Sequence, residues 1–396
     1  MTELLGSGLL SIAAFVAVIS FVVVIHELGH YWAGRLFGVH ADAFSIGFGP
    51  GVFGWTDRHG TRWRVAALPL GGYVKFRGDE NAASAPDHAA LQDMRERHPA
   101  PDTVFHFKPV WQRAIIVAAG PFANFLLAIA LFAVLGAARG DVRLEPLIGQ
   151  VVEASPAEAA GFRTGDLVTR MDGRSVDDFR DVMSHVMTRA GDPIRFTVER
   201  DGAQIDLTAT PERQVREDGL GGERSMGFLG VGLSDQAERA RETVAIWQAP
   251  AHGVERTVES AGLIFDYLGR LVTGRASVEH INGPIGIATT AGQLANSAVG
   301  SGPEGQIPVG SRLAALMLSL AALSALLSVA LGLMNLLPVP VLDGGHLVYY
   351  AYEAAAGKPP SPAIQEAGFK LGLGLLLCMV VVATWNDLSY LRGLFS

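Results

Sequence analysis

Cysteine and charged side chains are both scarce in this chain of 396 residues. The one cysteine, Cys378, excludes an intramolecular disulfide and a metal site built from several thiolates of one chain. Asp, Glu, Lys and Arg make up 18% of the residues, below the ~25% typical of soluble domains, and the mean hydropathy is +0.29. The net charge of −8 is spread along the chain, without the basic tract typical of nucleic-acid binding. These features exclude nucleic acid as a partner and indicate a membrane protein with a water-soluble part.

Four apolar runs are candidates for crossing a bilayer, which takes ~20 mostly apolar residues. Three of them are long enough by themselves: Leu4 to Ile25, Ala114 to Ala138, and Leu313 to Leu342. The fourth, Leu371 to Asn386, is shorter and needs the flanking Phe369 and Leu388. The sequence therefore predicts an α-helical polytopic membrane protein with four transmembrane helices.

The lysines and arginines set the expected orientation. Residues 1–6 contain neither, whereas the stretch from Arg35 to Arg113 contains ten. Because basic residues favour the cytoplasmic side, we expect this loop in the cytoplasm and the N-terminus outside. With four spans, the segment between the second and third spans and the C-terminus then also face outward.

The remaining segments predict the domain organisation. Residues 62–80, "RWRVAALPLGGYVKFRGDE", alternate around a turn at Pro69 and Gly71-Gly72, which is typical of a β-hairpin. We assign residues 1–139 to a first half of the membrane core and residues 311–396 to the second half. Residues 140–233 form a small β-rich domain, with strands at "IGQVV", "DLVTRMDG", "IRFTVER" and "QIDLTAT" and a helix at "SVDDFRDVMSHVMTRAG". Residues 234–310 form a helical linker.

The most informative short motif is "HELGH" at the end of the first apolar run. His26 and His30 are four residues apart, so on a helix they share a face and can bind one metal ion, with Glu27 beside them. This H-E-x-x-H pattern is that of two imidazoles on zinc and a carboxylate that takes a proton from water. Three polar groups at the end of a spanning helix are costly unless they are paired, bind a metal or face a cavity. The motif therefore indicates a zinc hydrolase.

A catalytic zinc usually takes a third protein ligand, and Cys378 lies in the fourth apolar run. Asp343 in "NLLPVPVLDGGHL" is the favoured candidate, since the first and third spans run in the same direction and bring both motifs to one side of the membrane. His346 is the competing ligand; Gly344-Gly345 suggests a turn that carries it away. Asn335, Pro338 and Pro340 interrupt the helix before Asp343, and interrupted backbone at membrane depth is tolerated where it lines a cavity.

At this point the chain resembles a known family, the site-2 protease family of intramembrane zinc metalloproteases (peptidase family M50), in the bacterial branch of the regulator of sigma-E protease. The similar pieces occur in the family's order along nearly the whole chain. They are "HELGHYWAGRLFGV", "FSIGFGP", "LPLGGYVKFRGDE", "GPFANFLLA", "INGPIGIA" and "NLLPVPVLDGGHL", together with a module similar to a PDZ domain.

The resemblance implies a set of site residues. His26, His30 and Asp343 would be ligands of one zinc ion per chain, with Glu27 as the catalytic base. Asn335, Pro338 and Pro340 would contact substrate, as would Gly71, Gly72 and Tyr73 of a membrane-associated hairpin that pairs with an unwound substrate. The β-rich domain would be a periplasmic PDZ-like domain that captures an extended peptide or C-terminus. The best-known members have two tandem PDZ domains, whereas this chain has room for one.

The function implied is hydrolysis of peptide bonds within the transmembrane segments of single-span membrane proteins, such as anti-sigma factors or remnant signal peptides. We expect a multi-pass protein of the bacterial inner membrane, in contact with the lipid bilayer, with its active site near the cytoplasmic side. One alternative is a catalytically inactive, PDZ-bearing membrane adaptor, against which the intact Glu27 argues. Another is a metal transporter, which would need more polar groups in the other spans than Asn124 and a few serines and threonines.

Overall fold

A computed structural model describes residues 2–79, 88–97, 101–217, 223–274, 283–300 and 308–395. The chain folds into two compact units. One contains Met1–Ala133, Gly253–Ala261 and Ile287–Val381, and the other contains Val134–His252, Gly262–Gly286 and Val382–Ser396. Each unit is described by itself below.

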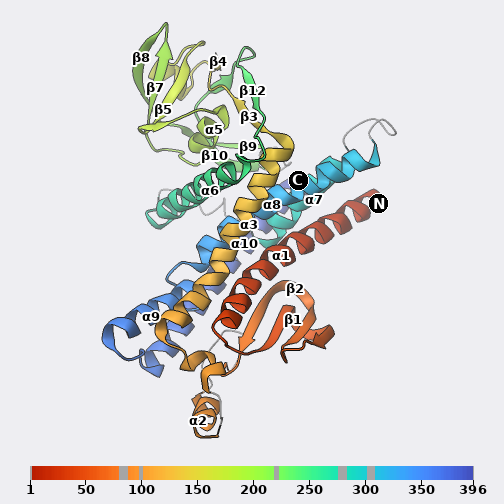
Figure 1. The fold of residues 1–396 in the computed structure, drawn as a ribbon. Coiled ribbons are helices and arrows are strands. Elements are labelled where there is room, and N and C mark those ends of the chain that lie inside the picture. The colour runs from red at the N-terminus through yellow and green to blue at the C-terminus, as the bar shows by residue number, and fades with distance from the viewer. Residues whose placement is uncertain are drawn as a thin grey trace. The chain divides into compact units, whose positions relative to one another are not determined.

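Four long helices confirm the predicted apolar spans (Figure 1). They are α1 (Thr2–Leu36), α3 (Val110–Arg139), α8 (Val309–Asn335) and α10 (Pro362–Phe395). Two boundaries differ from the expected ones. Helix α1 continues past Ile25 to Leu36, so the HELGH motif lies within the helix, and α8 ends at Asn335 because Pro338 and Pro340 cannot continue it.

A two-stranded sheet follows α1 and lies beside its C-terminal part (Figure 1). It consists of β1 (Ala41–Thr56) and β2 (Arg62–Phe76), joined by a turn in which Asp57 accepts hydrogen bonds from the backbone N–H groups of His59 and Thr61. The hydrophobic cluster beneath it includes Tyr31 of α1, Phe44 of β1 and Val74 of β2, and all three side chains are buried.

The expected hairpin around Pro69 and Gly71-Gly72 is wrong in its pairing. Residues 62–76 form one irregular strand, and Phe44 of β1 lies opposite both Trp63 and Val74 of that strand. The two arms of the expected hairpin are therefore separated by β1 instead of bonding to each other. Residue 71 must be glycine because the backbone there lies close to Phe48. Its φ is +120°, and a Cβ atom would come within 2.5 Å of the Phe48 ring.

Shorter helices complete the first unit. They are α2 (His88–Arg97), the 3-10 turns η1 (Pro101–Thr103) and η2 (Phe105–Phe107), α7 (Pro284–Gly300) and α9 (Asp343–Ala356). Helix α7 lies within the segment expected to be a linker, and its buried Ala291 and Ala295 pack with Ala14 of α1. The start of "INGPIGIA", residues 281 and 282, lies outside the described residues.

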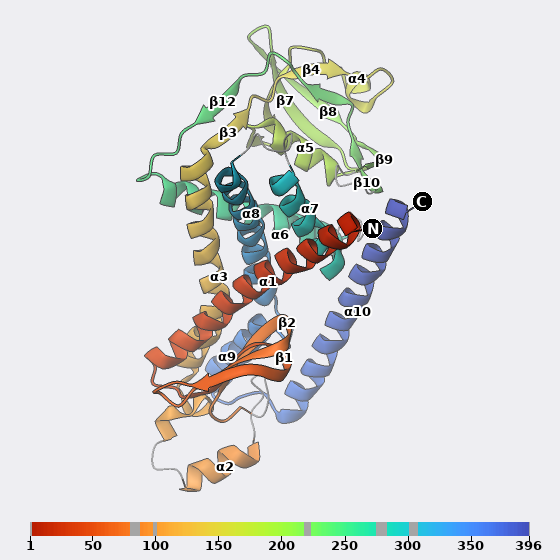
Figure 2. The ribbon, with the colours of Figure 1, turned by 90° about the vertical axis from the view of Figure 1, so that its right-hand side faces the viewer.

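The second unit contains the predicted β-rich module, and the expected strands and helix are confirmed (Figure 2). Its strands are β3 (Asp141–Leu144), β4 (Ile148–Val151), β5 (Leu167–Met171), β6 (Arg174–Ser175), β7 (Ile194–Arg200), β8 (Ala203–Ala209), β9 (Glu212–Glu217), β10 (Glu223–Phe228), β11 (Val231–Leu233) and β12 (Arg239–Glu242), and its helices are α4 (Pro156–Ala160) and α5 (Phe179–Met187). The largest sheet has the order β6-β5-β7-β8. Buried side chains of α5, such as Val182, pack with Phe196 and Val198 of β7. Strand β12 pairs with β3, so the module extends beyond residue 233.

Helix α6 (Ala249–Val272) follows the module. Its residues Gly253–Ala261 belong to the first unit and its remaining residues to the second. At the end of the chain, the buried Asp387 of α10 accepts hydrogen bonds from the backbone N–H groups of Gly283 and Ile285 and so caps the start of α7.

Candidate active site

Three side chains from opposite ends of the sequence converge inside the first unit. The Nε2 atoms of His26 and His30 lie 3.2 Å apart, and Oδ2 of Asp343 lies 3.2 Å from the first and 3.5 Å from the second. Both imidazoles are buried, and the carboxylate is 18% exposed. The predicted meeting of the HELGH motif with Asp343 is thus confirmed as a matter of position.

The outer nitrogens of both imidazoles face groups on α3. Nδ1 of His30 donates to the backbone carbonyl of Ile116 at 3.0 Å, because a carbonyl can only accept. Nδ1 of His26 lies 3.1 Å from the Asn124 amide, whose oxygen is buried without a hydrogen-bond partner among the described residues. Turning that amide by 180° pairs its oxygen with a proton on Nδ1 of His26. In both rings Nε2 is then unprotonated and presents a lone pair to the centre.

This donor set has the chemistry of a cation site. Two imidazole lone pairs and a carboxylate oxygen, Oδ2 of Asp343, which has no hydrogen-bond partner among the described residues, point at one spot. One proton can form a hydrogen bond between only two of these three atoms, whereas one divalent cation can bind all three. Ligand atoms of a tetrahedral zinc with bonds of ~2.0 Å lie about 3.3 Å apart, which matches the observed 3.2 to 3.5 Å. The residues therefore fit zinc with a fourth position open.

Two glycines allow α1 and α3 to approach closely at this point. A Cβ atom on Gly29 would lie 2.3 Å from the carbonyl oxygen of Ala119, and one on Gly120 would lie 2.2 Å from Nε2 of His30. Small residues at such crossings let helix backbones come together in a membrane. The glycine inside HELGH is thus required by packing, as is the glycine that begins "GPFANFLLA".

Asp343 reaches the histidines in a different way from the expected one. It does not end a spanning helix but begins α9, after a turn over residues 336–342. The expected turn at Gly344-Gly345 is wrong: both residues belong to the first turn of α9. They are glycines because a Cβ atom on either would lie 2.3 Å from a backbone oxygen, that of Leu337 or Val339.

His346 belongs to the surroundings of the three donors and not to the donor group. It lies one helical turn beyond Asp343 and lines the same cavity. Burial lowers the pKa of the His346 imidazole, which keeps the ring neutral at physiological pH. The structure favours Asp343 over His346 as the partner of the two histidines.

Glu27 lies between the donor group and strand β2. Its carboxylate accepts a hydrogen bond from the backbone N–H of Val74, and a Cβ atom on Gly72 would lie 3.3 Å from Cγ of Glu27. A cavity of about 340 Å³ opens here, and Glu27 and all three donors line it. A carboxylate in this place can exchange a proton with a molecule in the cavity.

The predicted substrate contacts divide into two groups. Gly71, Gly72 and Tyr73 of β2 line the cavity, as does Asn335 at the end of α8. Among the described strands, this part of β2 forms backbone pairs with β1 alone. Pro338 and Pro340 do not line the cavity; they form the turn that carries the chain from α8 to Asp343.

Sequence reasoning missed the residues of α3 that surround the histidines. The Ile116 carbonyl left no signal, because any apolar helix has carbonyls. Gly120 was noticed only as the first residue of "GPFANFLLA", without a role at the site. Asn124 did give a signal as a polar residue in an apolar run, but the sequence does not show which partner it meets.

Comparison with known proteins agrees with this arrangement. A family model described as peptidase family M50 matches residues 14–379. The metalloprotease MmpA of Caulobacter vibrioides is 45% identical, over 98% of this chain and 99% of its own length. Relatives named as zinc metalloproteases are 42% identical in Rhizobium meliloti, over 99% of this chain and all of theirs, and 41% identical in Agrobacterium fabrum, with the same coverage.

Proposed function

The chain belongs to peptidase family M50 and is a membrane zinc metalloendopeptidase, and from that premise we propose that it cuts peptide bonds within the transmembrane segments of single-span membrane proteins. The observation that carries the proposal is the place of the donor group. His26, His30 and Glu27 lie inside an apolar spanning helix, on a cavity that a strand also lines. A soluble protease has no need to place its catalytic groups at membrane depth, where unpaired polar groups are costly.

We assign His26, His30 and Asp343 as the zinc ligands. Their convergent lone pairs and tetrahedral spacing support this role. Asn124 and the Ile116 carbonyl hold the two imidazoles in the tautomer that binds metal through Nε2. Zinc bound here supplies Lewis acidity, which activates a water molecule and polarises the scissile carbonyl.

Glu27 is the general base. Its carboxylate takes a proton from the attacking water and can pass it to the leaving nitrogen of the cleaved bond. The hydrogen bond from the Val74 N–H holds the carboxylate toward the cavity. The cavity wall around it also contains apolar residues, such as Val23, Val117 and Leu331.

The substrate binds as an extended segment along β2. A transmembrane helix must unwind before its backbone can be cut, and hydrocarbon cannot satisfy the N–H and carbonyl groups that are freed. The backbone of Gly71, Gly72 and Tyr73 offers such partners beside Glu27, in the manner of strand addition. The Asn335 side chain is placed to contact the same segment.

The wider setting follows from the basic residues and the module. We place the protein in the bacterial inner membrane, with the N-terminus, the module and the C-terminus in the periplasm and the active site near the cytoplasmic side. The module over residues 140–233, extended by β12, is assigned as a single PDZ-like domain that binds an extended peptide or a C-terminus. Substrates such as anti-sigma factors or remnant signal peptides fit this arrangement, which is that of regulated intramembrane proteolysis.

The deciding experiment compares Glu27→Gln with the unaltered protein. The variant should lose cleavage of single-span proteins while its zinc content stays the same, because the amide cannot take a proton and the ligands are untouched. Full cleavage by Glu27→Gln would remove Glu27 from the mechanism. Fragments that accumulate in membranes of cells with the variant would identify substrates, and none accumulating would favour a non-catalytic adaptor.

The companion variant Asp343→Asn tests the third ligand. Replacing the anionic oxygen with an amide should lower zinc retention, measured as metal content after dialysis against a chelator. Unchanged retention would move the assignment to His346 or another donor.

A further inference from the structure

His346 lines the active-site cavity, and the mechanism proposed above gives it no role. It lies three residues after Asp343 on α9, so the two side chains are neighbours on one face of the helix, with Cβ atoms about 5–6 Å apart. The cavity that it lines is the one that Glu27 and the three donors also line. Among the described residues, neither nitrogen of the His346 ring has a hydrogen-bond partner. A buried polar ring that faces a reaction site without a partner is a candidate for contact with the substrate.

The following turns of α9 fix the position of His346. Tyr350, on the same face of α9, is buried in the hydrophobic cluster, and the guanidinium carbon of Arg113 on α3 lies 4.9 Å from the centre of its ring. Arg113 also forms an ion pair with Glu353 at 2.7 Å, in which the two side chains are only 11% and 16% exposed. The helix that carries His346 is thereby held against α3, which also contacts both histidines of the donor group. A donor on such a fixed element needs no reordering when charge develops beside it.

His346 faces the cavity as a neutral ring. Burial lowers the pKa of its imidazole, and a cation held by the three donors would lower that pKa further. A neutral imidazole carries one N–H group. Because no described residue accepts a hydrogen bond from the His346 ring, this N–H group is available to a molecule in the cavity.

Peptide hydrolysis creates a negative charge that needs a hydrogen-bond donor. When water adds to the scissile carbonyl, the carbonyl oxygen becomes negative, and Glu27 and Asp343 beside it are carboxylates that cannot donate when the reaction begins. The donors on β2 and at the end of α8 are assigned to the backbone of the substrate. On α9, Tyr350 lies seven residues from Asp343, about 10 Å along the helix, whereas His346 lies about 4.5 Å along it. His346 is therefore the better placed of the two α9 donors.

We propose that the N–H group of His346 donates a hydrogen bond to the scissile carbonyl oxygen as that oxygen becomes negative, which makes His346 a catalytic residue beside Glu27. The inference rests on the ligands and the base of the proposed function. Glu27 takes a proton from the attacking water and passes it to the leaving nitrogen as the C–N bond breaks. The electron pair that moved onto the carbonyl oxygen then returns to form the C=O bond again. His346 keeps its proton throughout and stabilises the charge between these two events.

The test replaces the ring by side chains with and without an N–H group. His346→Phe keeps a planar ring and removes the donor, whereas His346→Gln and His346→Asn place an amide N–H near the positions of Nε2 and Nδ1. The matched control is Tyr349→Phe, because the Tyr349 ring lies edge-on to His346 at 6.4 Å and does not line the cavity. Each purified, zinc-loaded protein is titrated by calorimetry with a phosphinic peptide, whose tetrahedral anion resembles the negative carbonyl. Zinc affinity is measured with a chelating dye, and cleavage with a single-span protein identified by the Glu27→Gln comparison.

His346→Phe should bind the phosphinic peptide about 100-fold more weakly and lose about 100-fold or more in kcat, with KM and zinc affinity unchanged. One of the two amide variants should recover most of the loss, and the control should behave as the unaltered protein does. Normal affinity of His346→Phe for the peptide would overturn the proposal, and equal losses in all three variants would do so by indicating a packing role. Loss of zinc from His346→Phe would make His346 a ligand and also overturn it. The titration needs no cleavage, so its result is separate from that of Glu27→Gln, whose full activity would refute the proposed function.

Discussion

Gly120→Ala adds one methyl group and should strongly weaken the binding of zinc to the folded protein. The new Cβ atom would lie 2.2 Å from Nε2 and 2.5 Å from Cε1 of His30, far inside the contact distance of such atoms. The His30 ring must therefore move by about 1 Å or turn away. Its Nε2 lies 3.2 Å from His26 and 3.5 Å from Asp343, so this shift takes it out of the tetrahedral arrangement.

The expected loss can be scaled from weaker perturbations. Removing a group that only orients a metal ligand typically costs 10–100-fold in affinity, and displacing the ligand itself should cost at least the upper end of that range. We expect zinc to bind about 100-fold more weakly or worse, which is about 2.8 kcal/mol. The helix itself should not unfold, because alanine is a better helix former than glycine by about 1 kcal/mol.

The measurement is competition between the purified protein and a chelating dye for zinc, together with thermal unfolding. Gly374→Ala is the matched control, since Gly374 lies in the spanning helix α10 and no atom lies within 4 Å of its Cβ position among the described residues. The control should bind zinc as the unaltered protein does. If Gly120→Ala kept normal zinc affinity and activity, the close packing of α3 against His30, and with it the assigned ligand geometry, would be refuted.

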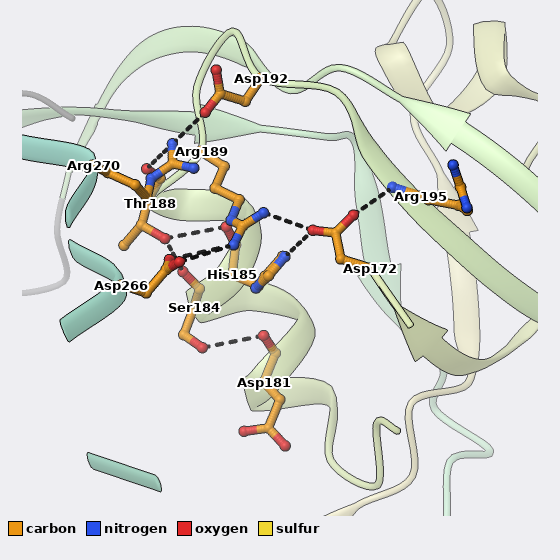
Figure 3. A network of polar contacts seen from close by, with 10 residues as sticks. All are labelled: Asp172, Asp181, Ser184, His185, Thr188, Arg189, Asp192, Arg195, Asp266 and Arg270. Atoms are coloured by element: carbon orange, nitrogen blue, oxygen red, sulfur yellow. Dashed lines mark hydrogen bonds and ion pairs between the residues drawn. The ribbon is translucent and has the colours of Figure 1, made fainter. Parts of the chain in front are cut away.

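Three further variants or conditions test neighbouring features. Asn124→Leu removes the hydrogen bond to His26 and should weaken zinc binding by about 10–100-fold in the same dye assay; equal affinity would mean that Asn124 does not orient the ring. Arg200→Met removes the guanidinium partner of the fully buried Asp166 carboxylate, which keeps only the hydrogen bond from the Arg163 N–H, and should destabilise the module by about 3 kcal/mol, seen as faster hydrogen exchange in β5 and β7; adding Asp166→Asn, which removes the charge and can still accept from that N–H, should recover part of the loss. Burial lowers the pKa of His185, so the stability that the neutral ring allows is complete above about pH 6.5 and is lost as the pH falls through the folded pKa of His185; protection factors of the α5 amides, corrected for the intrinsic exchange rate at each pH, that do not fall between pH 7 and pH 4 would contradict this. Hydrogen bonds lower the pKa of Asp172 against its own burial (Figure 3), so the stability it adds is lost only below about pH 3.9.

The apolar periodicity predicted the spanning helices well, because a bilayer demands length and apolarity that are written in consecutive residues. It did not predict where the helices end. The first helix continues through HELGH to Leu36. The third ends at Asn335 because Pro338 and Pro340 lack the backbone N–H that a continuing helix needs. Hydropathy alone reports neither a polar motif inside a span nor a break inside an apolar run.

The pairing of β2 could not be predicted either. Alternation and glycines near residue 71 suggested two arms that bond to each other, whereas residues 43–46 of β1 lie between those arms. Strand partners are chosen by distant segments that offer matching edges and side chains. A local pattern can therefore predict a strand and still give the wrong neighbour.

The sequence by itself determined the chemistry of the site. Two histidines four residues apart with a glutamate, in an apolar chain with one cysteine, predict a metal centre of histidine and carboxylate ligands, and the shared direction expected for two spans predicts that Asp343 lies beside it. Only the tertiary structure decided what makes that centre work: Gly29 and Gly120 bring α3 against the histidines, the Ile116 carbonyl and Asn124 hold their outer nitrogens, and the backbone of β2 lies beside Glu27. The physical reason is that the type of ligand follows from the identity of the side chain. The orientation of that side chain depends on backbone groups and close contacts, which many sequences share and which form only where distant segments meet.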